Sequence, residues 1–266
     1  MITNTFSLLY GIGEKSEQRL WSEGILTWTD FVGADGVSFL SRQRKALYDK
    51  TLRSASEELL KGNSRYFSTA LRRSEHWRLF PAFGQDAVCL DIETNGFAPG
   101  RGGKITVVGL YDGHDYKCLI RGRDLTEEAL NREFSRYKYL ITFSGSVFDI
   151  PFLSSSMKGF LTCDIPHFDL CSGARRLGLK GGLKKLEPRF GIKRHEAVCG
   201  LDGYDAVLLW QKAKKGSKEA LDRLILYNRE DTVNLFRMAG DIYKDLKAHT
   251  GIEKYAGALV ESSHGK

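Results

Sequence analysis

The sequence predicts an α/β domain that follows a smaller, helical N-terminal region. The first observation behind this prediction is that apolar, strand-length runs alternate with helix-length segments from residue 87 onward, which is typical of a sheet flanked by helices. The second is that residues 1–80 differ from the rest, because segments 40–60 and 64–73 have helical character. A chain of 266 residues has room for one large and one small domain.

The elements of the larger domain are expected in a simple order. We expect strands over 87–94, 105–111 and 115–120, a helix over 126–137, a strand over 139–143, a helix over 149–158, a short strand near 165–169, helices in the basic segment that follows, and a long helix from 217. Ser217 can cap that last helix. The chain from Gly257 onward is expected to be a loose tail.

The N-terminal region contains a hairpin, Leu9-Tyr10-Gly11-Ile12-Gly13, that resembles part of a helix-hairpin-helix element. In such an element a Gly-apolar-Gly hairpin presents backbone N–H groups at a helix N-terminus to a phosphate. Gly11 and Gly13 are therefore candidate nucleic-acid-binding residues. The alternative is a helical connector in which the glycines only end one helix and begin the next.

The composition suits a cytoplasmic protein. The chain has no run of eighteen apolar residues, so we expect no membrane span, and its first residues lack the basic and apolar segments of a secretory signal. The cysteines are odd in number and form no Cys-x-x-Cys pair, which favours free thiols without structural zinc. They are Cys89, Cys118, Cys163, Cys171 and Cys199.

Two acidic residues, Asp91 and Glu93, stand at the end of the first expected strand. The preceding run Val88-Cys89-Leu90 is apolar and typical of a buried strand. Residues i and i+2 of a strand point to the same face, so the two carboxylates emerge side by side. Like charges so close repel each other unless a cation lies between them, and a divalent cation with oxygen ligands is the simplest solution. A solvated surface pair is the alternative.

Two further aspartates occur in comparable contexts. Asp149 follows an expected strand and stands near the start of a helix, with Pro151 in the first turn; a plain helix cap is the alternative. Asp231 lies four residues after Tyr227, so the two share a helix face beside an apolar stripe. A partly buried aspartate needs a partner, and the alternative to a metal is a salt bridge.

Three short motifs resemble, in order and context, those of the DEDD superfamily of 3′–5′ exonucleases: Asp91-x-Glu93, Phe148-Asp149 and Tyr227-x-x-x-Asp231. The chain is most similar to the YprB-type ribonuclease-H-like domain of that superfamily, over residues 84–247. That extent leaves 1–80 as the helical region and 248–266 as a C-terminal tail.

The third motif resembles the tyrosine branch of the superfamily. Leu226 stands where the other branch has a histidine, and Tyr227 stands where this branch has its tyrosine. The chain departs from the family near the second motif, where Ser144, Gly145 and Ser146 replace a frequent asparagine. This departure puts one contact to the substrate backbone in doubt, but not the metal site.

The resemblance implies a ribonuclease-H-like mixed sheet flanked by helices and a metal-dependent 3′–5′ exonuclease. Such an enzyme releases nucleoside 5′-monophosphates from nucleic-acid ends, here expected to be single-stranded 3′ ends. It implies two ions, Mg²⁺ or Mn²⁺, with Asp91 bridging both, Glu93 and Asp231 on one, and Asp149 acting on the other largely through water. Tyr227 would orient the attacking water. The alternatives are a non-catalytic nucleic-acid-binding module on the same fold and a ribonuclease-H-like endonuclease.

The positive charge is concentrated between the second and third motifs. Residues 171–194 contain eight basic residues and one acidic residue, a net charge of +7 that equals that of the whole chain. Basic side chains beside an anionic metal site allow a nucleic-acid strand to approach; a solvated basic face is the alternative. The residues we expect to bind nucleic acid are Arg175, Arg176, Lys180, Lys184 and Lys185. A second run, from Lys212 to Lys218, is expected in an exposed loop.

Overall fold

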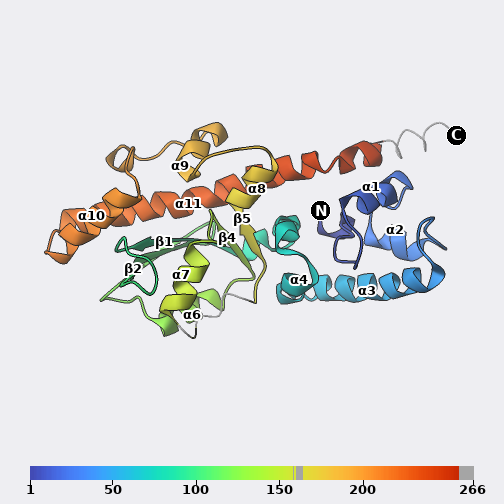
Figure 1. Ribbon diagram of the computed structural model, residues 1–266, viewed down its shortest axis with the longest axis horizontal. Coiled ribbons are helices and arrows are strands. Elements are labelled where there is room, and N and C mark those ends of the chain that lie inside the picture. The colour runs from blue at the N-terminus through green and yellow to red at the C-terminus, as the bar shows by residue number, and fades with distance from the viewer. Residues whose placement is uncertain (158, 160–163, 258–266) are drawn as a thin grey trace.

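The computed structural model describes residues 1–157, 159 and 164–257. Its centre is a five-stranded mixed sheet with the strand order β3-β2-β1-β4-β5 (Figure 1). The strands are β1 (Ala87–Thr94), β2 (Ile105–Tyr111), β3 (Tyr116–Ile120), β4 (Tyr139–Thr142) and β5 (His167–Asp169). The first three strands pair antiparallel, whereas β4 pairs parallel to β1 and β5 parallel to β4. The sheet is mixed, as predicted.

Helices cover both faces of the sheet. They are α6 (Glu127–Phe134), α7 (Asp149–Ser156), α8 (Leu170–Arg176), α9 (Leu183–Leu186), α10 (Gly203–Lys214) and α11 (Lys218–His249). Successive side chains of β1 point to opposite faces of the sheet, as in any β-strand. Val88 and Leu90 pack with α6 and α7, whereas Cys89 belongs to the apolar cluster that includes α11. Helix α11 crosses the sheet and runs along most of the molecule (Figure 1).

Helix α10 is an element that the sequence prediction missed. Asp202 caps it, with Asp205 in a reciprocal capping box, and Ala206 and Trp210 are buried one helical turn apart. Lys212 and Lys214 therefore end a helix rather than lying in the predicted loop, although both are exposed.

The N-terminal region is helical, as predicted. It contains α1 (Glu14–Ser22), α2 (Trp28–Gly33), α3 (Arg42–Leu60), α4 (Ser64–Ala70) and α5 (Phe80–Phe83), with 3₁₀ turns at Ile2–Asn4, Arg73–Leu79 and Gly84–Asp86. Two further 3₁₀ turns, Glu187–Phe190 and Glu196–Val198, lie in the larger domain. Helix α4 ends three residues before the predicted limit because the chain becomes extended at Leu71.

A buried ion network joins the N-terminal region to the larger domain. The guanidinium of Arg78 donates to Glu17 of α1 at 2.9 Å and to Glu75 at 2.6 Å. Glu75 also accepts from Arg176 of α8 at 2.7 Å. Glu17, Glu75 and Arg78 are buried. Because one continuous apolar cluster also spans both regions, the two form a single packed body.

The end of the chain differs in part from the predicted tail. Helix α11 continues to His249, residues 252–257 are helical, and Ile252 is buried. Tyr255 lies beside Trp21, with ring centroids 6.1 Å apart. The predicted loose segment beyond Gly257 lies outside the described residues.

The described cysteines are free thiols, and Cys89 is buried in β1 as predicted; Cys163 lies outside the described residues. Among the helices of the described part of the chain, none has the length and apolar character needed to cross a bilayer.

Candidate metal centre

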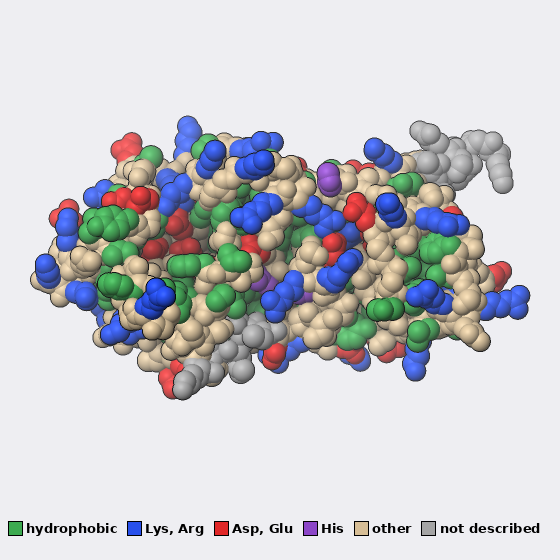
Figure 2. Space-filling model, viewed as in Figure 1, with side chains coloured by type: hydrophobic (Ala, Val, Ile, Leu, Met, Phe, Trp, Pro, Cys, Tyr) green, Lys and Arg blue, Asp and Glu red, His purple; other side chains and the backbone are tan. Residues whose placement is uncertain are grey.

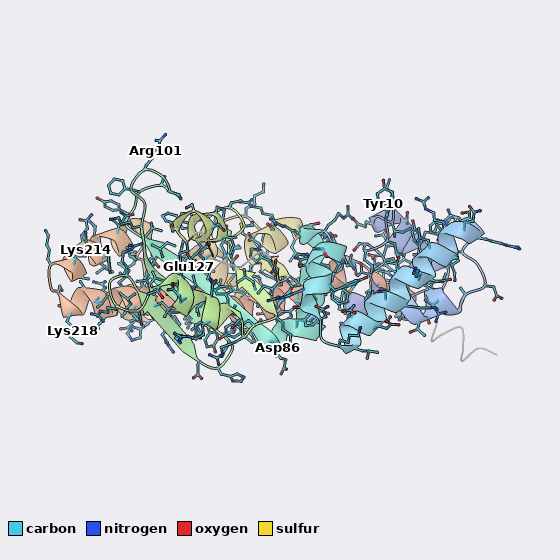
Figure 3. The ribbon with its side chains drawn as sticks, turned by 90° about the horizontal axis from the view of Figure 1, so that it is seen from below. Tyr10, Asp86, Arg101, Glu127, Lys214 and Lys218 are labelled. Carbon is cyan, nitrogen blue, oxygen red and sulfur yellow. The ribbon has the colours of Figure 1, made fainter. Side chains whose placement is uncertain are left out.

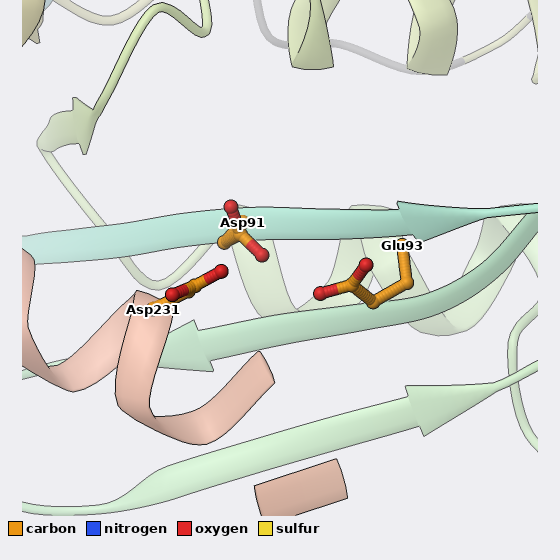
Figure 4. Close-up of side chains that lie close together, drawn as sticks. All are labelled: Asp91, Glu93 and Asp231. Atoms are coloured by element: carbon orange, nitrogen blue, oxygen red, sulfur yellow. The ribbon is translucent and has the colours of Figure 1, made fainter. Parts of the chain in front are cut away.

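Three carboxylates converge on one face of the sheet. Asp91, Glu93 and Asp231 each place an oxygen so that these atoms lie within 4.8 Å of one another (Figure 4). We call these three residues the acidic centre. Figure 2 shows acidic side chains in a hollow between the segments that carry α7 and α9. The structure therefore brings together the first and third sequence motifs.

The acidic centre depends on a close approach between α11 and the sheet. Gly109 of β2 lies opposite Asp91 in the antiparallel register. A Cβ atom at Gly109 would lie 2.0 Å from Oδ1 of Asn228 and 2.5 Å from Oγ1 of Thr232, both on α11. Because Gly109 has no side chain, α11 can approach β2 closely enough to place Asp231 at the acidic centre.

Asn228 is a site residue that the sequence reasoning missed. Its Nδ2 donates to Oδ2 of Asp91 at 2.8 Å, and its Oδ1 accepts from the hydroxyl of Tyr116 at 2.8 Å. Asn228 is fully buried. Its position directly after Tyr227 and three residues before Asp231 was the available signal, since residues i and i+3 of a helix share a face.

Asp149 lies beside the acidic centre, but not within the group of three. Its Oδ1 accepts from the backbone N–H of Ile92 at 3.1 Å, between Asp91 and Glu93 in the chain. Helix α7 begins at Asp149, and its N-cap residue is Phe148 rather than Asp149. The plain helix cap considered for this residue is therefore not what the structure contains.

The carboxylates hold protons more tightly than free carboxylates do. Burial and the neighbouring charge of Asp231 raise the pKa values of Asp91 and Glu93 well above their ordinary range. Burial raises the pKa of Asp149 to about 7. Burial also raises the pKa of Asp231, although Arg194 and Lys184 partly offset this effect. Buried groups of this kind are frequent at functional sites.

Arg194 provides the salt bridge considered for Asp231. Its Nη2 contacts Oδ1 of Asp231, and its Nε and Nη2 donate to Glu187 at 2.6 and 2.7 Å. Glu187 also accepts from Asn234 of α11 at 2.8 Å. The guanidinium is thus held in place on one side of the acidic centre. The sequence reasoning counted Arg194 only within the basic segment 171–194 and did not expect it to contact Asp231.

Tyr227 is buried on α11, one turn before Asp231. Its hydroxyl accepts a hydrogen bond from Nζ of Lys184, which lies 4.3 Å from the centroid of the tyrosine ring. Burial, together with the charge of Asp231, raises the pKa of this hydroxyl. Because Lys184 occupies a lone pair of the phenol oxygen, the phenol proton remains free to be donated elsewhere.

The predicted basic strip is not uniform. Lys184 contacts Tyr227 as described, whereas Arg175, Lys180 and Lys185 are exposed. Arg176 pairs with Glu75 in the buried network, and its side chain is 29% exposed. Two of the five predicted nucleic-acid-binding residues of the strip are therefore engaged by protein groups, and three face solvent.

The predicted hairpin glycines lie far from the acidic centre. Gly13 precedes α1 as its N-cap, and Gly11 has a positive φ of 81°. The chain before them forms a 3₁₀ turn at Ile2–Asn4 rather than a helix of α type. Tyr10, beside Gly11, lies in the opposite half of the molecule from Arg101 and Lys214 (Figure 3).

A basic pocket near the end of β1 is a second feature that the sequence reasoning missed. It has a volume of about 470 Å³ and starts at Asn95, two residues after Glu93. Four basic residues and two aromatic residues line it: Arg101, Lys104, Arg121, Lys214, Phe97 and Trp210. Phe97 is 62% exposed. Lys214 belongs to the second basic run of the sequence, whereas Arg101, Lys104 and Arg121 come from other segments that no run indicated.

The comparison with protein families agrees with this architecture. Residues 88–243 match the RNase_H superfamily. No curated protein matches the chain. A solved structure described as "apo form of the nuclease" has 20% sequence identity and a TM-score of 0.46, over 66% of this chain and 80% of that chain.

Proposed function

Because this chain belongs to the RNase_H superfamily, we propose that it is a metal-dependent 3′–5′ exonuclease of the tyrosine branch of the DEDD superfamily. It hydrolyses phosphodiester bonds at single-stranded 3′ ends and releases nucleoside 5′-monophosphates. The observation that carries this proposal is the acidic centre, with three carboxylates within 4.8 Å and Tyr227 one helical turn from Asp231.

The donor set of the acidic centre fits magnesium or manganese. All three groups are carboxylates, and hard oxygen ligands of this kind suit Mg²⁺ and Mn²⁺. Asp91, Glu93 and Asp231 would hold the metal, and Asp149 would contribute through water. When bound, a pair of such ions supplies an acidified water and stabilises the leaving oxygen.

The protein groups around the acidic centre have distinct tasks in this proposal. Asn228 fixes the carboxylate of Asp91 by donating to it. Arg194 fixes that of Asp231. Tyr227, whose oxygen accepts from Lys184, donates its proton toward the attacking water and orients it. The basic pocket after β1 and the exposed residues of the strip bind the phosphates of the strand.

Digestion of 5′-labelled single-stranded DNA and RNA tests the proposal. With Mn²⁺ or Mg²⁺ we expect a ladder that shortens from the 3′ end together with released mononucleotides, and no cleavage in EDTA. A few internal fragments would instead identify an endonuclease. Binding without any cleavage under all metal conditions would identify a non-catalytic module.

Asp91→Asn provides the matched test of the metal assignment. It removes a central carboxylate charge, and a loss of about 4 kcal/mol in transition-state stabilisation corresponds to roughly a thousandfold in rate. The control is Asp245→Asn, an exposed aspartate of α11, which should keep full activity. Near-normal turnover of Asp91→Asn would show that the metal assignment is wrong.

A further inference from the structure

A second cavity lies at the seam between the N-terminal region and the larger domain. It has a volume of about 310 Å³, at the lower end of the range for ligand sites, roughly 300–1,000 Å³. Its walls come from the 3₁₀ turn Arg73–Leu79, from the loop between β4 and α7, and from β5 and the start of α8. We call it the seam pocket. Figure 2 shows histidine beside lysine or arginine side chains near the middle of this face.

Two groups in the seam pocket lack a partner within the protein. Trp77 is buried, and its indole N–H has no hydrogen-bond acceptor among the described residues. A buried donor without an acceptor costs roughly 1–3 kcal/mol, so an acceptor from a ligand would relieve a real penalty. Arg73 is exposed and, in the described part of the chain, forms no ion pair. Both groups line the pocket.

The other charged groups of the seam pocket are already satisfied. The carboxylate of Asp169 accepts from the backbone N–H groups of Ser144, Ser146, Cys171 and Ser172, and from the hydroxyl of Ser146. These donors compensate the negative charge of Asp169, so this carboxylate does not prevent an anion from binding in the pocket.

Two further lining residues leave the balance positive. Arg176 is paired with Glu75 and also lines the pocket. Burial lowers the pKa of His167 to about 4, so it is neutral at neutral pH. The lining residues Arg73, Arg176 and Asp169 sum to a formal charge of +1, and because Glu75 pairs with Arg176, the uncompensated positive charge is that of Arg73.

The same loop separates the seam pocket from the acidic centre. Ser146 lines the seam pocket, and Asp149, three residues later, binds Ile92 beside the acidic centre. Asp169 holds Ser144 in a left-handed conformation with a φ of 64°, which is uncommon for a residue other than glycine. The loop is therefore fixed in place from the pocket side.

From these observations we propose that the seam pocket binds a phosphate group of a nucleotide. The guanidinium of Arg73 and the indole N–H of Trp77 donate to the phosphate oxygens. Ser74 and Ser172, both exposed, also line the pocket. Identifying the ligand as a nucleotide rests on the proposed function, whereas the anion site itself does not. The phosphate comes either from the strand backbone or from a released mononucleotide.

Calorimetric titration of the full chain in EDTA tests the seam pocket without the metal centre. A nucleoside 5′-monophosphate should bind, the matching nucleoside should bind at least tenfold more weakly, and Arg73→Gln should weaken binding of the monophosphate at least tenfold. Arg65→Gln is the matched control, because Arg65 is exposed on α4 and outside the pocket. It should bind like the wild type.

Two further probes distinguish the source of the phosphate. If the strand backbone is the ligand, a short oligonucleotide binds more tightly than the monophosphate, and its salt slope falls by about 0.7 in Arg73→Gln. If the released nucleotide is the ligand, the monophosphate binds at least as tightly as the oligonucleotide. Trp77→Phe should weaken binding of whichever of these two probes the wild type binds more tightly. The melting temperature of the variant checks that it is folded.

Equal affinity of the wild type and Arg73→Gln for every phosphate probe would overturn the proposal, as would equal affinity for nucleoside and monophosphate. Both results are independent of hydrolysis. A seam pocket that binds phosphate in a protein without nuclease activity would remove the proposed function and leave the anion site standing.

Discussion

At the scale of single residues, Lys184 and Lys185 show how neighbours in one basic run can differ. Both were expected to contact the substrate backbone. In the structure Lys184 donates to the hydroxyl of Tyr227, and Lys185 is exposed. The sequence cannot separate the two, because their identity and local composition are the same. The difference arises from the packing of the fold, which brings Lys184 but not Lys185 to Tyr227 of α11.

This pair gives a prediction with an internal control. Lys184→Gln should lower turnover about tenfold to a hundredfold, since it releases the orientation of Tyr227 and small misplacements of reacting groups are costly. Lys185→Gln should keep turnover and reduce the salt slope of single-strand binding by about 0.7.

Steady-state kinetics of Tyr227→Phe and of the double variant Lys184→Gln/Tyr227→Phe complete a double-mutant cycle with Lys184→Gln. Tyr227→Phe should lower turnover and leave metal affinity unchanged. If Lys184 acts through Tyr227, adding Lys184→Gln should cause little further loss. Additive losses would show that the two residues act separately.

Asp149 gives a prediction on pH at the same scale. Its pKa is about 7 in the metal-free fold and about 3.9 in an unfolded chain. Between these values the folded state binds the additional proton, so the contribution of Asp149 to stability falls as the pH rises from about 4 to about 7. In EDTA, the melting temperature of Asp149→Asn should therefore increase relative to that of the wild type as the pH rises over this range.

The comparison with Asp149→Asn is needed because His167 acts in the opposite sense. Its pKa is lowered to about 4, so its contribution to stability rises with pH up to about 6.5. Both proteins share that effect, and their difference isolates Asp149. A difference in melting temperature that stays constant from pH 4 to 8 would contradict the raised pKa.

At the scale of elements, the sequence predicted most of the sheet and the long helix. The bounds of β1 and β2 are those expected, and Ser217 caps α11 by accepting from the N–H of Ala220. With the match to the RNase_H superfamily, the predicted ribonuclease-H-like fold class is confirmed. These predictions succeeded because strand runs and helix caps are local signals.

Features that depend on contacts across the fold were not predictable. Asn228 and Arg194 reach the acidic centre through the packing of α11 and of the segment before α10, which no local pattern encodes. The basic pocket after β1 is likewise assembled from separate segments. The predicted metal ligands lie in motifs, whereas Asn228 and Arg194 were missed because they act by positioning the motif residues.

The close packing of α11 on β2 gives a prediction at this scale. Gly109→Ala would place a methyl group 2.0 Å from Asn228, and overpacking of this kind costs about 1–3 kcal/mol. Gly240→Ala on α11 is the control, since nothing lies within 4 Å of its Cβ position. It should stabilise the protein by up to about 1 kcal/mol through helix propensity.

Urea unfolding of both glycine variants measures these changes. Gly109→Ala should also weaken metal-induced stabilisation, because the shift of α11 moves Asp231. Unfolding of Gly109→Ala at the wild-type urea concentration would show that α11 can move away from β2 without cost.

At the scale of the whole molecule, the buried network makes the N-terminal region part of the domain. Arg78→Met leaves Glu17 and Glu75 buried without their shared partner, and breaking a buried pair in this way costs about 3–5 kcal/mol. Arg53→Met, at an exposed position of α3, should change stability by less than about 0.5 kcal/mol. We expect the wild type to unfold in one transition, with coincident fluorescence and circular dichroism curves. Two separated transitions would show that the regions are independent.

The contacts between α11 and the N-terminal region also constrain how the chain matures during translation. Trp21 and Trp77 emerge from the ribosome well before their aromatic neighbours Tyr255 and Tyr243 are synthesised. At about 5–20 residues per second, the delay is on the order of ten seconds or more. During that interval the nascent N-terminal region exposes aromatic surface that α11 and residues 252–257 later cover. A nascent chain stalled before α11 should therefore be a ready client for chaperones, whereas the completed chain should not.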